Sequence, residues 1–406
     1  MPEGTTAAET MPPMRDTRLN SPVPSDGAPA GLPAVAKGEF LKCFPAVREK
    51  IERAVEEGTP LRVLISDIDG TLHIGAGHTA IERTEGREDL RRLITTLQRD
   101  GWLVFGVTGS HFDTGSGATQ SIRSRIESGE LPAIGDRDGS GFAFDGIVTD
   151  GGADLFAPGL GGTGTRVPTL RAGIPMPDDT EYERTVERAT ELCRAINARS
   201  DLHPLDFELI RRFDGHLPAG AAAFGSRIFP QLAAEDLAPH RASGKYALYF
   251  YAASTTERDL IAAAFSAAFP EQRIVCCEER DANTAARRLL PPGSAFPRKY
   301  CLDIVPFDKG TPVDFLAREL AASVALVEPD PAHRPRLQVW YAGDAGNDLP
   351  AAAAPAVTDV IIVGGASEEL VRAAEGLSRA GKRVFVDEVP GRIGPASIRE
   401  ILAVAG

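Results

Sequence analysis

The stretch RVLISDIDGT, residues 62–71, decides the fold of this chain. It begins with a short apolar run, which is typical of a strand that is buried on both faces. The run ends at Asp67, and Asp69 follows two positions later. Residues two apart on an extended chain point the same way, so both carboxylates face one site. Gly70 permits a sharp turn in which the backbone approaches a ligand closely.

The same pattern recurs on both sides of this stretch. Further apolar runs predict strands at 102–107, 146–149, 337–341, 360–363 and 383–386. Helical patterns separate these runs, and buried strands that alternate with helices indicate a parallel sheet covered on both faces. We therefore predict an α/β fold with a doubly wound parallel sheet. Ligands bind such sheets at the carboxyl ends of the strands.

The middle of the chain follows a different order. A stretch rich in glycine and proline is followed by a predicted helix at 179–198, strands at 205–210 and 246–251, a helix at 256–269 and strands at 273–276 and 300–305. This order indicates an α+β module inserted into the sheet. The predicted organisation is a first core part at 61–153, an inserted α+β domain at 154–302 and a second core part at 303–406.

The N-terminal region adds little to this core. Residues 1–37 are rich in proline, alanine, glycine, serine and threonine, a composition that predicts a disordered tail. Apolar residues at helical spacing within 38–60 predict one amphipathic helix.

Composition limits the function classes. The chain has 406 residues, 43% hydrophobic and 25% charged, as expected for a globular protein of more than one domain. Its net charge of −13 argues against nucleic acid or an anionic membrane as the main partner. No apolar run reaches the length of a membrane span. The five cysteines lack zinc-ligand spacing, which predicts reduced thiols and a cytoplasmic location.

Asp67 and Asp69 are candidates for phosphoryl chemistry. A carboxylate such as Asp67 attacks phosphorus when a cation neutralises the phosphoryl oxygens. Asp69 then protonates the leaving oxygen and later takes a proton from the water that clears the intermediate. The alternative is a strand-end turn with two solvated acids.

Three further segments carry polar groups at predicted strand ends or helix starts. In GDAGND, 343–348, Asp344 is placed to bind a hard divalent cation, and Asn347 and Asp348 to complete or orient its shell. The alternative is a polar loop in which Asp348 caps a helix. Lys309 near a helix N-terminus, and Thr108 with Gly109 after the second strand, can hold a phosphate, although such residues are most often surface groups.

These motifs together resemble those of the haloacid dehalogenase-like (HAD) phosphatases. The match consists of DIDGT at 67–71, TGS at 108–110, Lys309 and GDAGND at 343–348. The resemblance implies a Rossmann-like core and Mg²⁺ held by Asp67, Asp69, Asp344, Asn347 and Asp348. One position departs from the family pattern, because Ser110 stands where relatives often have arginine.

The insert resembles the C2B-type α+β cap of the family class that contains sucrose-phosphate, mannosylglycerate-phosphate and trehalose-phosphate phosphatases and phosphomannomutase. The chain looks most like the sucrose-phosphate phosphatase branch. The resemblance implies a Mg²⁺-dependent phosphomonoesterase that hydrolyses a sugar phosphate or related polyol phosphate through an aspartyl-phosphate. A sugar phosphotransferase or phosphomutase of the same fold is one alternative, and a non-catalytic module that binds sugar phosphates is another.

Specificity in this reading comes from the cap, since the core chemistry is common to the family. The candidate contacts with the leaving group are Arg211, Arg212, Asp214, His216 and Lys245. All lie near predicted loop or strand ends, where binding groups concentrate. The segment 211–215 fits a plain surface hairpin equally well.

Overall fold

The computed structural model describes residues 38–75, 78–113, 121–136, 139–158, 165–167, 178–205, 210, 227–230, 244–279, 283, 297–389, 391–392 and 394–405. The predicted tail at 1–37 lies outside the described residues, as does most of the predicted strand at 205–210.

The described part of the core is built around one eight-stranded sheet with the order β14-β13-β12-β1-β2-β5-β6-β7. Its strands are β1 (Leu61–Asp67), β2 (Leu103–Val107), β5 (Gly146–Thr149), β6 (Asp154–Ala157), β7 (Thr165–Val167), β12 (Leu337–Gly343), β13 (Asp359–Ile362) and β14 (Arg383–Val386). The six strands predicted from the sequence form its parallel part. The predicted α/β class with a doubly wound sheet is confirmed.

Two strands of this sheet were missed. β6 and β7 run antiparallel at one edge and fall inside the range 154–302 that the sequence analysis assigned to the insert. A second small sheet pairs β3 (Ala133–Ile134) with β4 (Ala143–Phe144). β3, β4 and β7 have only two or three residues, too few side chains to show a periodicity.

The register of the central strands brings three strand ends together. Asp67, the last residue of β1, pairs with Val107, the last residue of β2. On the other side of β1, Ser66 pairs with Ala342, next to the last residue of β12. Because all three strands run parallel, the residues that follow them emerge at the same edge of the sheet.

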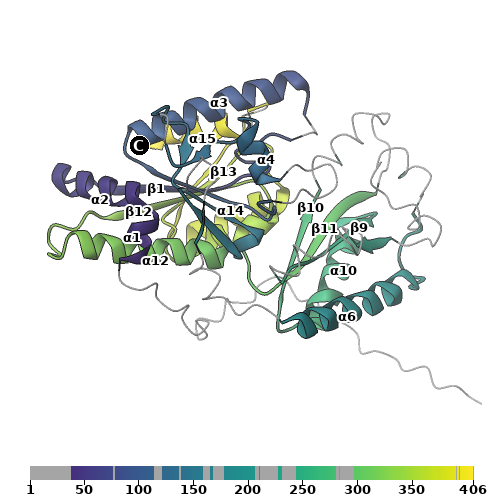
Figure 1. Ribbon diagram of the computed structural model, residues 1–406. Coiled ribbons are helices and arrows are strands. Elements are labelled where there is room, and N and C mark those ends of the chain that lie inside the picture. The colour runs from purple at the N-terminus through teal and green to yellow at the C-terminus, as the bar shows by residue number, and fades with distance from the viewer. Residues whose placement is uncertain are drawn as a thin grey trace, which may run out of the picture. The chain divides into compact units, whose positions relative to one another are not determined.

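Helices cover both faces of this sheet. α3 (Ala80–Arg99) and α15 (Pro395–Ala405) pack together on one face, and α2 (Pro45–Glu57) and α12 (Gly310–Val327) pack together on the other (Figure 1). Shorter helices complete the described core: α1 (Glu39–Cys43), α4 (Ile122–Glu127), α13 (Leu349–Ala353) and α14 (Glu368–Arg379). Apolar side chains point to both faces of each central strand, which explains why these strands read as continuous apolar runs. The structure shows no described helix that is long and apolar enough to cross a membrane.

The prediction of one helix over 38–60 is wrong, because two helices meet there at Phe44. α1 ends at Cys43, and α2 begins at Pro45. Proline disfavours a helical conformation in the residue before it, and Phe44 takes φ −125° and ψ 70°. Proline is well tolerated at the first position of the helix that it starts.

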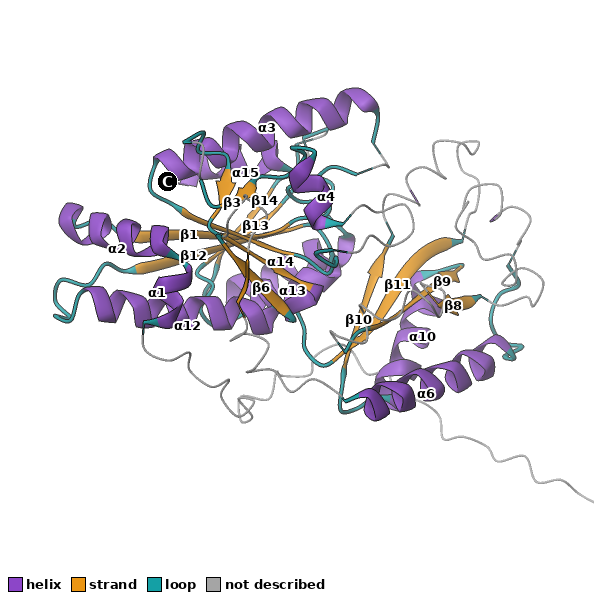
Figure 2. Cartoon of the chain, in the orientation of Figure 1, coloured by secondary structure: helices purple, strands orange, loops and turns teal. Residues whose placement is uncertain are grey.

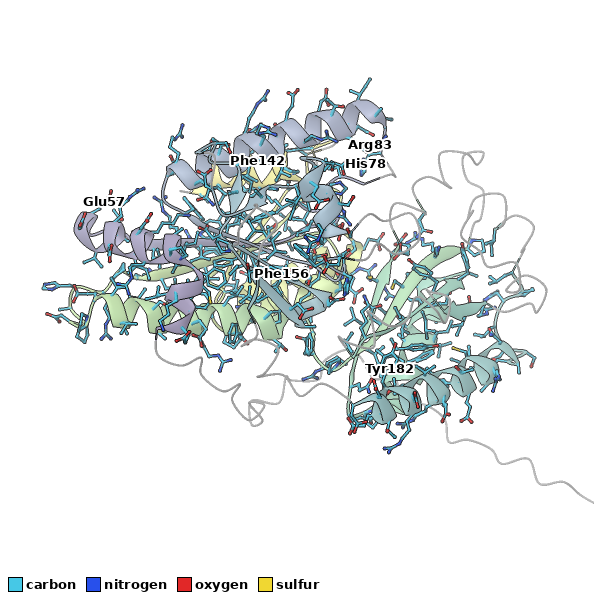
Figure 3. The ribbon with its side chains drawn as sticks, viewed as in Figure 1. Glu57, His78, Arg83, Phe142, Phe156 and Tyr182 are labelled. Carbon is cyan, nitrogen blue, oxygen red and sulfur yellow. The ribbon has the colours of Figure 1, made fainter. Side chains whose placement is uncertain are left out.

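The inserted module contains a four-stranded antiparallel sheet with the order β10-β11-β9-β8 (Figure 2). Its described elements are α6 (Asp179–Asn197), β8 (Ile228–Pro230), β9 (Tyr246–Ala252), α10 (Thr255–Ala268), β10 (Arg273–Glu278) and β11 (Arg298–Val305). Both helices bury apolar side chains against the sheet, and Tyr182 of α6 is one of them (Figure 3). The predicted helices at 179–198 and 256–269 and the last three predicted strands are therefore present.

Candidate active site

Asp67 and Lys309 form the centre of the site. The Asp67 carboxylate lies at the end of β1 and is only 2% exposed. Its Oδ1 accepts a hydrogen bond from Lys309 Nζ at 2.6 Å, and the same Nζ donates to Asp348 Oδ1 at 2.7 Å. Lys309 directly precedes α12, so the start of this helix carries a buried cation to the ends of the parallel strands.

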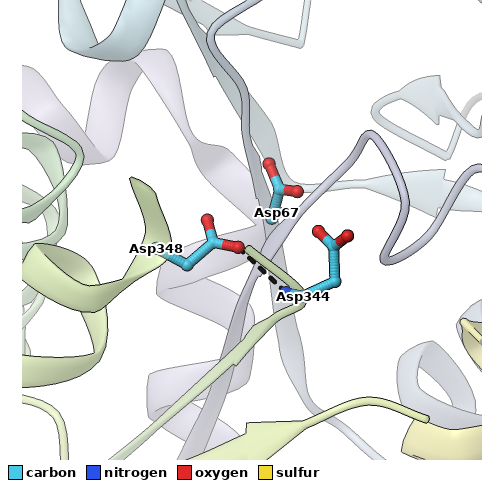
Figure 4. A group of neighbouring side chains, drawn as sticks. All are labelled: Asp67, Asp344 and Asp348. Atoms are coloured by element: carbon cyan, nitrogen blue, oxygen red, sulfur yellow. Dashed lines mark hydrogen bonds between the residues drawn. The ribbon is translucent and has the colours of Figure 1, made fainter. Parts of the chain in front are cut away.

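Three carboxylates cluster at this point. Oxygen atoms of Asp67, Asp344 and Asp348 all lie within 4.8 Å of one another, and all three side chains are buried (Figure 4). Thr71 links two of them, because its hydroxyl donates to Asp344 Oδ1 at 3.1 Å and lies 3.4 Å from Asp67 Oδ2. Gly70 has φ 87°, and a Cβ there would lie 2.4 Å from Asp344 Oδ2, so the close approach of the two loops requires glycine.

Asp348 accepts hydrogen bonds on both of its carboxylate oxygens. Its Oδ1 accepts from Lys309 and from the Tyr341 hydroxyl, the latter at 2.8 Å. Its Oδ2 accepts from the backbone N–H groups of Asp344 at 2.9 Å and Ala345 at 3.0 Å. Four donors fill the acceptor capacity of a carboxylate, which suits a group that orients the loop and holds Lys309.

The cluster perturbs the protonation of its members. Burial, and then the neighbouring Asp348 charge, raise the pKa of Asp67 well above its usual range, although Lys309 opposes this. Burial alone would lower the pKa of Lys309, but the Asp348 and Asp67 carboxylates outweigh burial and raise it. Lys309 therefore remains a cation among the acidic groups.

Asp69 is held in a different environment from Asp67. Its Oδ1 accepts from Arg125 Nη1 at 2.5 Å, and its Oδ2 accepts from the hydroxyls of Thr108 at 2.9 Å and Ser110 at 2.8 Å. Burial by itself would raise the pKa of Asp69, but the Arg125 guanidinium, His73 and the Ser110 hydrogen bond together outweigh burial and lower that pKa. Two carboxylates two residues apart thus have pKa values shifted in opposite directions in the metal-free fold.

The turn after β5 fixes the loop after β2. The backbone N–H of Asp150 donates to Ser110 O at 3.1 Å, and that of Gly151 donates to Thr108 O at 2.9 Å. Asp150 takes φ 54°, a conformation that aspartate tolerates better than most residues. The hydroxyl donors to Asp69 therefore sit on a loop whose backbone is itself hydrogen-bonded.

Among the described residues of the insert, Lys245 contacts this loop. Lys245 precedes β9 and is 7% exposed, and its Nζ lies 2.9 Å from Asp303 Oδ2 and 3.3 Å from Gly109 O. Burial alone would lower the pKa of Lys245, yet the neighbouring acidic groups, Asp303 foremost, together outweigh burial and raise that pKa. The ammonium group therefore stays charged beside the predicted phosphate-binding loop.

The structure brings most of the predicted site residues together. Asp67, Asp344, Asp348 and Lys309 share direct contacts, and Asp69 and Thr108 lie beside them. The carboxylate of Asp69 faces Arg125 and the two hydroxyls and is not a member of the three-carboxylate cluster. Lys245 reaches Gly109, whereas the other candidate cap contacts, Arg211, Arg212, Asp214 and His216, lie outside the described residues.

Five residues of the site were missed: Thr71, Ser110, Arg125, Asp303 and Tyr341, of which Ser110 was noted only as a departure from the family pattern. Thr71 stands inside the quoted DIDGT segment, so its place in that motif could have identified it. Tyr341 lies two positions before Gly343 in a strand that was predicted correctly, but strand parity does not fix its contact with Asp348, which lies in the turn after the strand. The sequence carries no signal for Arg125 or Asp303, because their partners come from distant segments.

The residues present fit a hard divalent cation. Three carboxylates and one ammonium leave the cluster with two negative charges when all four groups are ionised. The buried Oδ1 of Asn347 accepts no hydrogen bond in the described part of the chain, so it is available to a cation or to a donor on a substrate. Carboxylate and amide oxygens are the ligand types that Mg²⁺ prefers.

Comparison with known proteins gives likenesses of fold only. No family model matches the chain, and no curated protein matches it. The chain is similar to the phosphatase BT1666 of the HAD superfamily from Bacteroides thetaiotaomicron, with 13% identity and a TM-score of 0.42 over 85% of this chain and 96% of that one. The chain is also similar to yhjK, a haloacid dehalogenase-like hydrolase from Bacillus subtilis. The sequence identity is 13% and the TM-score 0.36, over 85% of this chain and 92% of that one.

A third similar structure is the C-terminal domain of trehalose-6-phosphate phosphatase from C. albicans. It shows 9% identity and a TM-score of 0.34, covering 84% of this chain and 82% of that one. Scores and identities this low carry no argument about activity. The functional assignment therefore depends on the geometry of the site itself.

Proposed function

We propose that this chain is a Mg²⁺-dependent phosphomonoesterase of the HAD-like type, acting on a sugar phosphate or related polyol phosphate through an aspartyl-phosphate. One observation carries the proposal. A buried carboxylate, Asp67, lies 2.6 Å from a buried ammonium at the edge where the parallel strands end, within a cluster of three carboxylates. A second carboxylate, Asp69, is held beside it with its side chain 40% exposed.

The residues have distinct roles in the reaction. An Asp67 oxygen attacks phosphorus, so an O–P bond forms while the bond between phosphorus and the leaving oxygen breaks. Asp69 supplies the proton that the leaving oxygen takes up. Water then attacks the aspartyl-phosphate and returns a proton to Asp69, which frees inorganic phosphate and regenerates Asp67. Asp69 must be protonated for the first step, although its neighbours favour the carboxylate, so substrate has to perturb these contacts.

Positive groups and backbone amides support the phosphoryl oxygens. We assign this role to Lys309, Thr108 and Gly109, which lie at a helix start and at the end of β2. Asp67, Asp344 and Asn347 would hold Mg²⁺, and Asp348 would orient them, while the Asp69 carboxylate faces Arg125 and two hydroxyls outside the three-carboxylate cluster. When bound, Mg²⁺ supplies charge neutralisation for the phosphoryl group.

The inserted module would act as the cap that selects the leaving group. Its described α+β sheet supports the proposal of a C2B-type cap, as in the sucrose-phosphate phosphatase branch. Lys245, Arg211, Arg212, Asp214 and His216 are the proposed contacts with sugar hydroxyls. Cytoplasmic location is part of the proposal, and the odd number of cysteines favours it.

Phosphate release from a panel of sugar, disaccharide and glycerate phosphates with Mg²⁺ tests this function. The expected result is stoichiometric inorganic phosphate and free sugar from one substrate class. Isomerised sugar phosphate without free phosphate would instead indicate a mutase. Tight binding without turnover across the panel would contradict an enzymatic role.

Magnesium should stabilise the folded chain through the carboxylate cluster. At a free concentration one hundred times its dissociation constant, a ligand that binds only the folded state adds about 2.7 kcal/mol to the free energy of unfolding. We expect a Mg²⁺-dependent rise in the melting temperature of the wild type that is largely lost in Asp344→Asn. Asp359→Asn, which changes a buried aspartate at the start of β13, should keep the rise. An equal rise in both variants would place the cation elsewhere.

Lys245→Met should weaken substrate binding more than turnover. Its ammonium lies 3.3 Å from Gly109 O, beside the proposed phosphate-binding loop. Loss of one charged hydrogen bond to the substrate costs about 1.5–3 kcal/mol, so we expect KM to rise by roughly 10- to 100-fold. Steady-state kinetics on the best substrate measure this. Lys299→Met removes another buried lysine of the insert and serves as the matched control, with KM expected near that of the wild type. A KM unchanged in Lys245→Met would remove this residue from the substrate contacts.

A further inference from the structure

A buried arginine, Arg125, donates a hydrogen bond to Asp69, the proposed acid–base residue. Arg125 belongs to the short helix α4 and is only 2% exposed. Its Nη1 donates to Asp69 Oδ1 at 2.5 Å, while the Asp69 side chain is 40% exposed. The cation is therefore enclosed by protein, and its carboxylate partner faces outward. Burying a guanidinium in this way is costly unless it is paired.

The position of Arg125 is fixed by its surroundings. Ile122 and Ile126 of the same helix pack in the main apolar core. The carbonyl oxygen of Arg125 accepts from the backbone N–H groups of Glu130 at 2.8 Å and Leu131 at 3.0 Å. Because the Arg125 side chain is buried and its backbone is hydrogen-bonded, the guanidinium has little freedom to follow a movement of Asp69.

Within the part of the chain that the structure describes, three donors to Asp69 leave one direction open. An ionised carboxylate has about four acceptor positions. Arg125 occupies one on Oδ1, and the hydroxyls of Thr108 and Ser110 occupy two on Oδ2. The donors come from two different elements, so the plane of the carboxylate as well as its direction is set.

We propose that Arg125 is a positioning residue that orients the Asp69 carboxyl group so that its open position carries the proton to the leaving oxygen and later accepts a proton from the attacking water. This inference rests on the proposed phosphomonoesterase function. Arg125 touches neither the phosphoryl group nor its cation in this account. It acts through Asp69, and its contribution appears only where proton transfer limits the rate.

The competing account is that Arg125 only stabilises the fold. The two accounts differ in how a variant responds to the leaving group. If Arg125 only stabilises the fold, its loss lowers the amount of folded enzyme, so the rate falls by the same factor for every substrate. A positioning role affects substrates whose leaving oxygen needs a proton, such as alkyl phosphates, much more than 4-nitrophenyl phosphate, whose leaving oxygen departs as a stable anion.

The experiment compares kcat for alkyl, phenyl and 4-nitrophenyl phosphates in the wild type, Arg125→Met, Arg125→Lys and Arg123→Met. General acid catalysis contributes roughly 10²- to 10⁴-fold, so we expect Arg125→Met to lose about 100-fold on alkyl phosphates and less than about fivefold on 4-nitrophenyl phosphate. KM should change little. Arg125→Lys should recover part of the loss, because it restores a cation without the guanidinium geometry.

Arg123→Met is the matched control. Arg123 lies on the same helix, pairs with Asp113 at 2.6 Å near the surface and should keep the wild-type dependence on the leaving group. In an Asp69→Asn background, Arg125→Met should add no further loss. A loss that is equal for all leaving groups, or an additive loss in that background, would overturn the inference. If Arg125→Met does not fold, the same comparison is made with Arg125→Lys, and an unchanged dependence on the leaving group would again overturn it.

The failure of the inference is distinct from that of the proposed function. If the wild type releases no phosphate from any of these substrates, or if Asp67→Asn remains active, the phosphomonoesterase assignment fails. If the wild type is active and depends on Asp67, but Arg125→Met behaves like Arg123→Met, only the role of Arg125 is refuted.

Discussion

Lys309→Met is expected to destabilise the folded chain by about 3–5 kcal/mol and to abolish phosphate release, because removing one partner of a buried ion pair leaves an uncompensated charge. Lys309 Nζ bridges Asp67 at 2.6 Å and Asp348 at 2.7 Å, and all three side chains are at most 6% exposed. Without the ammonium, three clustered carboxylates lack their compensating cation. Urea unfolding of the metal-free protein measures the loss.

Two further variants test whether the loss comes from these charges. Adding Asp348→Asn to Lys309→Met removes one orphaned charge and should recover part of the lost free energy of unfolding. Lys50→Met breaks another buried pair, in which Lys50 Nζ lies 2.9 Å from Asp145, so it should lower stability while the folded enzyme keeps its kcat. A Lys309→Met protein as stable as the wild type would show that the bridge contributes nothing.

The fold was largely predictable because its signal is local. Each central strand is a short apolar run, and the polar residues that follow it mark its carboxyl end, as at Asp67 and Thr108. Parallel strands place such ends at one edge, so a sequence pattern implies a spatial cluster. Local patterns do not fix the exact residue at which one element ends and the next begins. Apolar residues continue at helical spacing on both sides of Pro45, and this spacing hides the break between α1 and α2.

The contacts that tune the site were not predictable for a different reason. Arg125 meets Asp69 across 56 positions of sequence, and Lys245 reaches Gly109 across 136. Nothing in the local sequence of an arginine on a short helix distinguishes it from a surface residue such as Arg123. Residue type and spacing therefore predict which groups react, whereas tertiary packing decides which side chains orient them.

The opposite pKa shifts of Asp67 and Asp69 connect the packing to the chemistry. Burial and like charges make the ionised form of Asp67 unfavourable in the metal-free fold. A cation bound at the cluster would offset this cost. Arg125 and two hydroxyls stabilise the ionised form of Asp69 instead. The fold thus prepares one carboxylate for a cation and a phosphoryl group and holds the other in a fixed orientation.

Asp67→Asn should remove activity and yet stabilise the metal-free protein. Loss of a covalent nucleophile costs at least about 10³-fold in kcat, in line with variants of other nucleophilic enzymes. The pKa of Asp67 is raised on folding, so the folded state holds this proton more tightly than the unfolded state does. Stability of the wild type therefore falls as the pH rises from the ordinary range of aspartate, near 3.9, towards the raised value.

Asparagine carries no such charge, so its advantage over aspartate should be greatest at neutral pH and shrink as the pH is lowered. Melting temperatures of the metal-free proteins between pH 5 and pH 8 measure this, with Asp359→Asn as the control for a buried aspartate outside the cluster. Mg²⁺ should reverse the order, because it stabilises the wild type more than the variant. A variant that is inactive but less stable than the wild type at neutral pH without Mg²⁺ would show that the Lys309 contact outweighs burial and the neighbouring carboxylates.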